Sequence, residues 1–256
     1  MVDVGSGQPL VLIPGIQGRW EWMAPLVAAL ASKRRIITDS LPGEPGSASP
    51  LNGKYDFDTF VRHIDGLLDA AKVSSAVVCG VSFGGLIAMR YAARRPERVK
   101  ALILVSTPGP RWRPDPRQAK YMRWPLLSSP LFALRAVQRS WAELRVTFPD
   151  LPERLRFLAQ TAPVVLKAPA APWRMGARAQ MAEAEHFEHD CACITAPTLV
   201  IAGERGLDTV VTYDETMSCV TSIDCATFQL LEKTGHLGTV SAPARLAAII
   251  SRFLND

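Results

Sequence analysis

The sequence contains no apolar run long enough to span a bilayer, so no transmembrane helix is expected. Residues 1–7 carry neither the basic stretch nor the apolar core of a secretory signal peptide. The five cysteines are an odd number without the spacing of a disulfide framework, a pattern typical of reduced thiols. We therefore predict a cytoplasmic protein whose cysteines are free.

Histidine is scarce, with four residues in the whole chain. His63 falls at an exposed phase of a predicted helix, and we expect it on the surface. His186 and His189 lie among Glu, Asp and Cys in 185–193, which superficially resembles a metal-binding tract. Several potential ligands in a short polar linker do not make a closed site, so we predict no metal and no other cofactor.

The net charge of +5 is unevenly distributed. Residues 110–182 hold 13 Lys+Arg against 4 Asp+Glu, a balance of +9, which leaves 5 − 9 = −4 for the remainder. This basic segment is broken by Pro and Trp and has no nucleic-acid module pattern, so a nucleic-acid partner is not predicted. Solvated helix faces are the favoured explanation, and a field that attracts anionic substrates is the alternative.

Short apolar runs alternate with helical patterns along most of the 256 residues. This rhythm is typical of an α/β fold with a mostly parallel sheet and helices on both faces. Strands are predicted at 9–13, 35–39, 75–79, 99–105, 198–202 and 226–231, with helices after Trp22, at 57–71, after Gly84, around 212–220 and at 243–254.

Residues 108–190 interrupt this rhythm with recurring prolines and short helical patches, such as 130–145 and 152–161. We predict a helical insertion over the sheet, called the lid below, and a core made of 1–107 and 191–256. Phe132 and Trp141 of the lid are candidates for an apolar substrate pocket. The alternative is that they bury the lid against the sheet.

Residues 80–84 read Gly-Val-Ser-Phe-Gly, between a predicted strand and a predicted helix. A G-x-S-x-G motif needs this strand–turn–helix context, because a Cβ two residues before or after the serine would collide with its neighbours. The helix begins behind the hydroxyl, and its free N–H groups face any negative charge that develops there. The pattern favours Ser82 as a nucleophile, and an incidental serine in a glycine-rich turn is the alternative.

A serine hydroxyl becomes a good nucleophile when a base takes its proton and a carboxylate orients that base. His236 follows the last predicted strand, where its loop reaches the carboxyl edge of the sheet. Asp208 follows the preceding strand and lies between the serine and the histidine in the chain, in the order that this topology requires. Asp214 and Glu204 are the alternative acids.

Together these motifs resemble the α/β-hydrolase superfamily. The resemblance implies an eight-stranded, mostly parallel sheet with 108–190 as the lid. Because the chain begins close to Leu10, one of the first antiparallel strands is expected to be very short or missing. The motifs that carry the resemblance lie at 5–15, 80–85, 94–99, 196–204 and 235–236.

The resemblance also implies roles for individual residues. Ser82 would be the nucleophile, His236 the general base and acid, and Asp208 the group that holds the imidazole. The backbone N–H groups of Phe83 and Ile16 would form the oxyanion hole.

Two departures from the family pattern concern the same machinery. Pro14-Gly15 stands where many relatives have His-Gly, and Gln17 then becomes an additional candidate donor to the oxyanion hole. Gly206 stands where the acid normally would, so Asp208 is assigned two residues later.

These observations predict a serine hydrolase, a carboxylesterase that cleaves a small to medium ester through an acyl-enzyme with water as co-substrate. Carbon–carbon bond hydrolysis of dienoic diketones, lactone opening and metal-free perhydrolysis are alternatives with the same triad. The basic lid is compatible with a substrate that bears a carboxylate. Epoxide hydrolysis and dehalogenation are disfavoured, because in this fold they use an aspartate at position 82. A binding protein without turnover is the alternative from another class.

Overall fold

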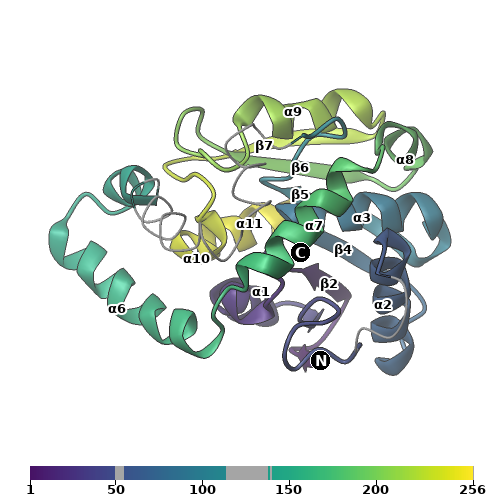
Figure 1. Ribbon diagram of the computed structural model, residues 1–256, viewed down its shortest axis with the longest axis horizontal. Coiled ribbons are helices and arrows are strands. Elements are labelled where there is room, and N and C mark those ends of the chain that lie inside the picture. The colour runs from purple at the N-terminus through teal and green to yellow at the C-terminus, as the bar shows by residue number, and fades with distance from the viewer. Residues whose placement is uncertain (50–54, 114–137, 139, 256) are drawn as a thin grey trace.

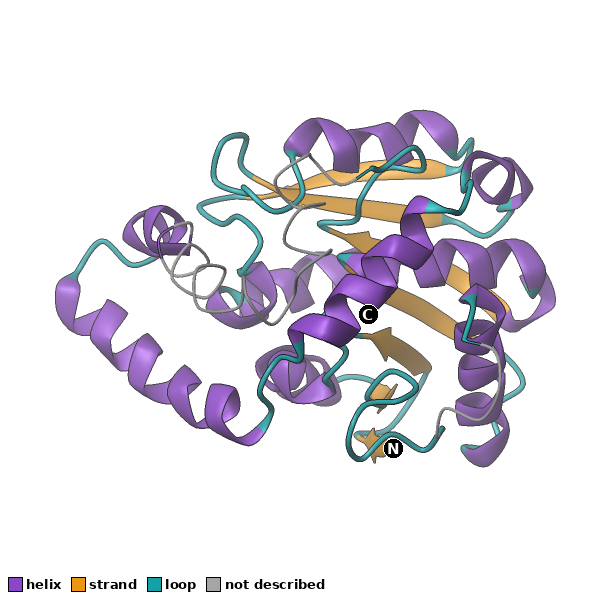
Figure 2. Cartoon of the chain, in the orientation of Figure 1, coloured by secondary structure: helices purple, strands orange, loops and turns teal. Residues whose placement is uncertain are grey.

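The computed structural model describes residues 1–49, 55–113, 138 and 140–255. Figures 1 and 2 show a twisted central sheet with helices packed around it. The seven strands of the described part follow the order β1-β3-β2-β4-β5-β6-β7. β1 pairs with β3 in antiparallel fashion, and the other pairs are parallel. The strands are β1 (Val2–Val4), β2 (Pro9–Ile13), β3 (Arg35–Thr38), β4 (Ala76–Val81), β5 (Val99–Val105), β6 (Thr198–Gly203) and β7 (Ala226–Leu231).

The central strands are continuous apolar runs because helices cover both of their faces. Every residue of β4 and of β6 is buried. The predicted strands are confirmed, and β4 extends two residues further, to Val81. The expected short antiparallel strand is β1, with three residues, and the described part of the chain has seven strands where the resemblance implied eight.

The helices form one layer on each side of the sheet. On one side α1 and α11 pack against the sheet through residues such as Leu26 and Leu246. On the other side α2, α3, α8 and α9 share a second apolar cluster with the sheet. The bounds are η1 (Trp20–Met23), α1 (Ala24–Ala31), α2 (Phe57–Ala70), α3 (Phe83–Arg94), η2 (Pro96–Arg98), α8 (Glu188–Cys193), α9 (Tyr213–Ser222), α10 (Gly238–Ser241) and α11 (Pro243–Phe253).

The prediction that His63 lies on the surface is wrong. His63 is 6% exposed, its Nδ1 lies 2.7 Å from Ser49 Oγ, and its Nε2 lies 3.7 Å from Asp39 Oδ2. The loop after β3 supplies both partners, so it covers a face of α2 that the helical pattern alone assigns to solvent. Burial lowers the pKa of His63, although Asp39 opposes that shift.

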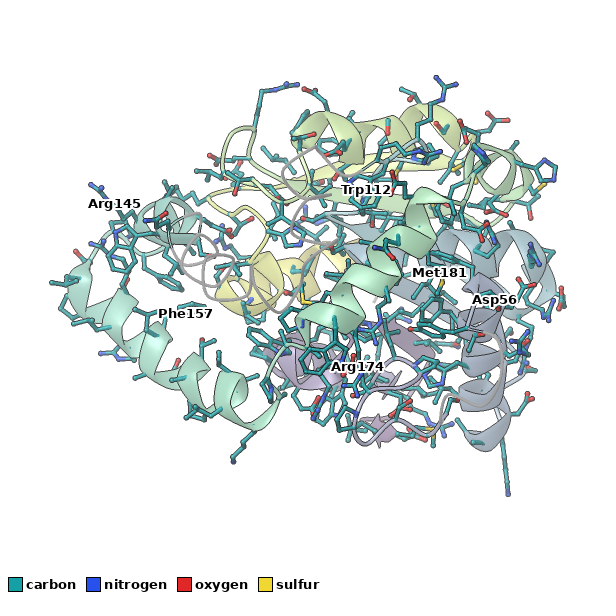
Figure 3. All side chains as sticks on the ribbon, in the orientation of Figure 1. Asp56, Trp112, Arg145, Phe157, Arg174 and Met181 are labelled. Atoms are coloured by element: carbon teal, nitrogen blue, oxygen red, sulfur yellow. The ribbon has the colours of Figure 1, made fainter. Side chains whose placement is uncertain are left out.

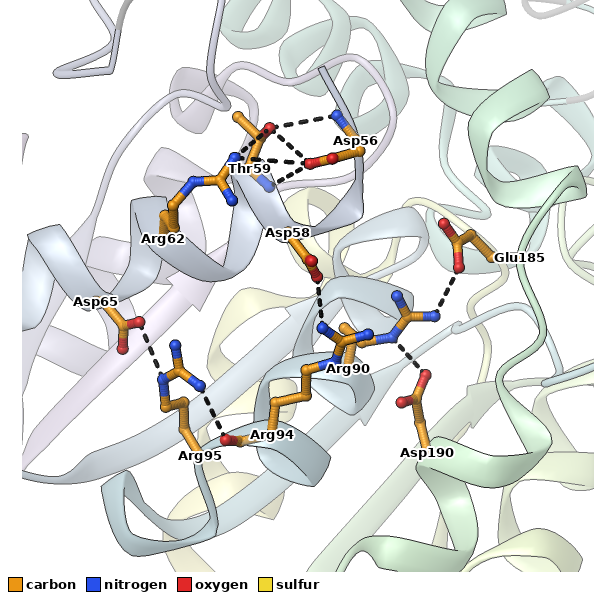
Figure 4. A network of polar contacts seen from close by, with 10 residues as sticks. All are labelled: Asp56, Asp58, Thr59, Arg62, Asp65, Arg90, Arg94, Arg95, Glu185 and Asp190. Carbon is orange, nitrogen blue, oxygen red and sulfur yellow. Dashed lines mark hydrogen bonds and ion pairs between the residues drawn. The ribbon is translucent and has the colours of Figure 1, made fainter. Parts of the chain in front are cut away.

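A polar network ties α3 to its neighbours (Figure 4). Arg90 of α3 is 4% exposed and donates to Asp190 at 2.6 Å and to Glu185 at 2.9 Å. Its guanidinium also lies 5.1 Å from the ring centre of Phe187. Because this charge is buried and paired, α8 is fastened to the helix that follows Ser82.

In the segment 185–193, Phe187, Asp190 and Cys191 are therefore buried against α3, while His186 and His189 are exposed. Among the described residues, no group of three or more His, Cys, Asp or Glu side chains is arranged to hold a metal ion. All five cysteines are free, as predicted. No helix within the described ranges is long and apolar enough to cross a membrane.

The described part of the lid is helical. Residues 140–147 form one helical segment, followed by α6 (Leu151–Lys167) and α7 (Pro172–Glu183). The predicted helical patch at 152–161 is therefore part of a longer helix, whereas α7 has no counterpart in the sequence-based prediction. Figure 1 shows α6 standing off from the sheet and α7 crossing in front of it. Residues 114–137, which include Phe132, lie outside the described residues.

Candidate active site

Ser82 occupies the turn between β4 and α3. Its backbone has φ 54° and ψ −125°, a conformation that a residue with a Cβ adopts at a cost in strain. The turn is held from both sides, because Ser82 N donates to Val105 O at 2.8 Å and Gly85 N donates to Ser82 O at 2.8 Å. Ser82 is 7% exposed, so its hydroxyl lies in a largely enclosed place.

The two glycines of the motif are required by close packing. A Cβ on Gly80 would collide with Gly84 and lie 2.6 Å from the Cα of Gly85. A Cβ on Gly84 would lie 2.5 Å from the carbonyl oxygen of Ile13 at the end of β2. These contacts supply the steric reason for G-x-S-x-G at this strand–helix junction.

Asp208 and His236 lie in hydrogen-bonding contact, with 3.0 Å between Asp208 Oδ2 and His236 Nδ1. The other carboxylate oxygen of Asp208 accepts the N–H groups of Val210 at 3.0 Å and Val211 at 2.9 Å. Asp208 is 7% exposed. One oxygen is therefore occupied by its own loop, and the other is directed at the imidazole.

The two alternative acids have other partners. Asp214 forms a two-point pair with Arg205, at 2.6 and 2.7 Å, on the surface. Glu204 Oε1 accepts the N–H of Lys233 at 2.7 Å. Among the three carboxylates considered from the sequence, the structure brings Asp208 to His236.

The loops that carry Asp208 and His236 pack directly on each other. A Cβ on Gly235 would lie 2.8 Å from Asp208 N, and one on Gly203 would lie 2.5 Å from Thr234 O. Both loops follow the carboxyl ends of β6 and β7, and β5 lies between β4 and β6. Ser82, Asp208 and His236 are thus collected at one edge of the sheet, the place where open α/β sheets bind ligands.

The charges at this edge shift both pKa values. Burial would lower the pKa of His236, but the charge and hydrogen bond of Asp208, together with the charge of Glu143, raise it above its usual value. Burial would raise the pKa of Asp208, but His236 and two backbone N–H groups hold it below its usual value. The pair is therefore an ionised carboxylate beside an imidazole with increased proton affinity.

Glu143 is a residue that the sequence analysis missed. It comes from the helical segment 140–147 of the lid and is 2% exposed. Its carboxylate oxygens accept the N–H of Leu237 at 3.0 and 3.1 Å. A second carboxylate thus holds the residue that follows His236. No motif marks Glu143; its only signal is that acidic residues are rare in 110–182.

The candidate oxyanion hole lies between the start of α3 and the loop after β2. Phe83 is the first residue of α3, so its N–H has no acceptor within the helix. Residues 14–19, called the oxyanion loop below, follow β2. They begin beside the turn that carries Ser82, because Ile13 of β2 pairs with Gly80 of β4. A Cβ on Gly15 would lie 3.4 Å from Ser82 Cβ and 2.8 Å from Gln17 Oε1. The structure thus brings Gln17 close to the turn.

Trp141 is the lid residue proposed for a substrate pocket that lies within the described residues. Trp141 is 37% exposed, with the Arg154 guanidinium 5.7 Å from its ring centre, and its role stays a prediction. A groove of about 400 Å³ runs between α6, η1 and α10. Figure 3 labels Phe157, which lines it from α6. Its other apolar and aromatic lining residues include Trp22, Pro25, Phe148, Val164, Val240 and Pro243.

The α/β-hydrolase class of folds is defined by a mostly parallel sheet with a serine at a tight strand-to-helix turn. An acid and a histidine follow later strands of the same sheet. A family model described as "alpha/beta hydrolase fold" matches residues 8–243. The chain therefore belongs to this family.

Curated relatives cover nearly the whole chain. A 2-hydroxymuconate semialdehyde hydrolase of Pseudomonas sp. is 29% identical over 99% of this chain and 89% of its own length. A 2-hydroxy-6-oxo-2,4-heptadienoate hydrolase of Pseudomonas putida is 24% identical over 98% of this chain and 91% of its own length. These two relatives are named for hydrolysis of small conjugated acids or aldehydes.

Solved structures share the fold. A meta-cleavage product hydrolase from Pseudomonas fluorescens superposes with a TM-score of 0.74 at 24% identity, over 99% of this chain and 93% of that one. An enol-lactonase from Burkholderia xenovorans has a TM-score of 0.77 at 22% identity, over 100% of this chain and 95% of that one.

Proposed function

We propose that this protein hydrolyses a carbon–carbon bond in a small dienoate that carries both a carboxylate and a keto or aldehyde carbonyl. The supporting observation is the similarity, over 98–99% of the chain, to hydrolases named for such compounds. This proposal reverses the order of the two chemistries considered from the sequence, where ester hydrolysis came first.

In the proposed mechanism Ser82 Oγ adds to the carbonyl carbon beside the bond to be broken. His236 takes the hydroxyl proton, and Asp208 holds the resulting imidazolium. The N–H groups of Phe83 and Ile16 bind the oxyanion, and Gln17 is a further candidate donor.

Collapse of the tetrahedral adduct breaks the carbon–carbon bond. This step requires the keto tautomer of a 2-hydroxydienoate, in which the hydroxyl proton has moved to the carbon of the bond to be broken. The electron pair left on that carbon is then delocalised onto the 2-keto group, and the resulting dienolate receives the proton from His236. Water, deprotonated by His236, then releases the acyl group from Ser82 as a carboxylic acid. One water is consumed for each bond cleaved. The raised pKa of His236 suits this route, because the imidazolium must keep its proton until the carbon leaving group can take it.

The basic lid supports an anionic substrate. The balance of +9 over residues 110–182 would raise the local concentration of a dienoate around the site. Ester or enol-lactone hydrolysis is the second candidate, because an oxygen leaving group needs only the same proton from His236. The free cysteines support a reducing compartment such as the cytoplasm.

The test is a substrate profile of the purified protein. 2-Hydroxymuconate semialdehyde and 2-hydroxy-6-oxo-2,4-heptadienoate are followed by loss of their absorbance, beside p-nitrophenyl acetate and an enol-lactone. We expect the highest kcat/KM for a dienoate and loss of at least about 10⁴-fold in kcat on Ser82→Ala. Turnover of esters alone would replace the carbon–carbon proposal by the ester one, and full activity of Ser82→Ala would remove both.

A further inference from the structure

The oxyanion loop is held from the lid by one buried arginine. Arg178 of α7 is 1% exposed. Its Nη1 donates to the carbonyl oxygen of Ile16 at 2.9 Å, its Nη2 to Glu44 Oε1 at 2.6 Å and its Nε to Tyr55 Oη at 3.2 Å. One guanidinium thus joins the lid to three separate places in the core.

The loop has the shape that this side chain needs. Gly18 has φ +78°, and a Cβ built on it would collide with Arg178 Nη1 and lie 2.8 Å from its Cζ. A residue other than glycine would therefore push the guanidinium away from the loop, besides being strained at this φ.

Burial of this charge is balanced by a carboxylate. The side chain of Glu44 is 1% exposed, and its second oxygen accepts from Arg174 at 3.1 Å. Figure 3 labels Arg174 on the same lid helix. Apolar side chains often replace a buried ion pair without loss of stability, so packing alone does not account for an arginine here. Because Glu44 balances the charge, what remains distinctive is the bond from Nη1 to Ile16.

That bond acts on the Ile16–Gln17 peptide, which shares the Cα of Ile16 with the Gly15–Ile16 peptide that carries the Ile16 N–H. In a trans peptide the carbonyl of Gly15 and the N–H of Ile16 point in opposite directions. The Gly15 carbonyl is held by Gly18 N at 2.9 Å, and the next carbonyl, of Ile16, is held by Arg178. Both peptide planes that meet at Ile16 are therefore held.

We propose that Arg178 is a positioning residue: by holding the Ile16–Gln17 peptide it fixes the backbone at Ile16, so that the Ile16 N–H faces the oxyanion formed at Ser82. This inference rests on the acyl-enzyme chemistry of the proposed function and holds for ester and carbon–carbon substrates alike. It makes α7 of the lid a structural part of the oxyanion hole.

The experiment compares Arg178→Met and Arg178→Lys with Arg174→Met. The control removes a partner of the same carboxylate that has no bond to Ile16. Rates on an activated aryl ester are divided by the number of sites that a fluorophosphonate titrates to completion, so unfolded protein is not counted.

For Arg178→Met we expect kcat to fall about 10- to 100-fold, less than the ~100- to 1,000-fold that follows removal of a whole oxyanion donor. KM should change by less than about twofold, because the bond acts on the transition state. Affinity for a trifluoromethyl ketone, whose adduct carries the oxyanion, should fall by the same factor as kcat/KM. The kcat of Arg178→Lys should lie between those of wild type and Arg178→Met. The kcat of Arg174→Met should stay within about twofold of wild type.

The outcomes separate the two proposals. A wild-type protein without a fluorophosphonate adduct and without turnover overturns the proposed function. An active wild type, with wild-type kcat per titrated site in Arg178→Met, overturns the positioning role even if Tm falls. If the methionine variant does not fold, Arg178→Lys decides: a kcat reduced about fivefold or more, with unchanged circular dichroism, supports the role, and wild-type kcat rejects it.

Discussion

The two loops beside Ser82 are each held by a lid residue, and the two residues carry opposite charges. On the side of His236, Glu143 accepts the backbone N–H of Leu237. On the oxyanion side, Arg178 donates to the carbonyl of Ile16. The charge of Glu143 reaches the imidazole and raises its pKa, whereas Glu44 balances the charge of Arg178. The carboxylate of Glu143 therefore both holds the His236 loop and raises the pKa of the imidazole, whereas Arg178 acts on residues 14–19 through its hydrogen bond alone.

The largest effect should come from the acid on the side of His236. In Asp208→Asn we expect kcat to fall by about 10⁴-fold, because the amide no longer stabilises the imidazolium or selects its tautomer. Asp214→Asn is the matched control, since its carboxylate pairs with Arg205 on the surface. Steady-state rates on the best substrate measure both. Similar losses in the two variants would contradict the assignment of Asp208.

Glu143→Gln should produce a smaller and pH-dependent effect. The base must be neutral to accept the serine proton, so activity falls on the acid side of the His236 pKa. Because the negative charge of Glu143 raises that pKa, its removal should move the acid limb of the kcat/KM profile to lower pH. Asp208 still raises the pKa in the variant, so the shift should be partial.

The control for this shift is Glu183→Gln, which removes an exposed carboxylate from α7 of the lid. Its pH profile should coincide with that of wild type. An unmoved acid limb in Glu143→Gln would show that this carboxylate acts only by holding the loop. A shift of equal size in both variants would assign the effect to the general charge of the lid.

The smallest effect should come from a surface ion pair that serves as a reference for the buried ones. Asp58 and Arg94 lie 2.8 Å apart with 46% of each side chain exposed (Figure 4). We expect Asp58→Asn to change the free energy of unfolding in urea by less than about 1 kcal/mol. Removing one partner of the buried pair of Arg178 and Glu44 should cost roughly 3–5 kcal/mol. Equal losses would mean that burial does not distinguish the two pairs.

The strands and the turn that carries Ser82 could be predicted because they depend mainly on local sequence. Continuous apolar runs indicate strands covered on both faces. Gly80 is required by contacts within one strand–turn–helix unit, whereas Gly84 is required by its close approach to Ile13 at the end of β2. The choice of the acid could not be made from the sequence alone, because Asp208, Asp214 and Glu204 all follow β6. The hydrogen bond to His236 distinguishes Asp208 from the other two. The prediction for His63 was wrong because the loop after β3, which the helical pattern does not reveal, buries this side chain.

The sequence by itself determined the strands and the serine turn, because each depends on residues near one another in the chain, and it gives the chain order of Ser82, Asp208 and His236 directly. Only the tertiary structure decided what surrounds them. Glu143 and Arg178 lie in a proline-broken segment whose pattern does not show which side chains turn inward, and their partners are 94 and 162 residues away. Burial of a charge depends on such distant partners, and no local pattern carries that information.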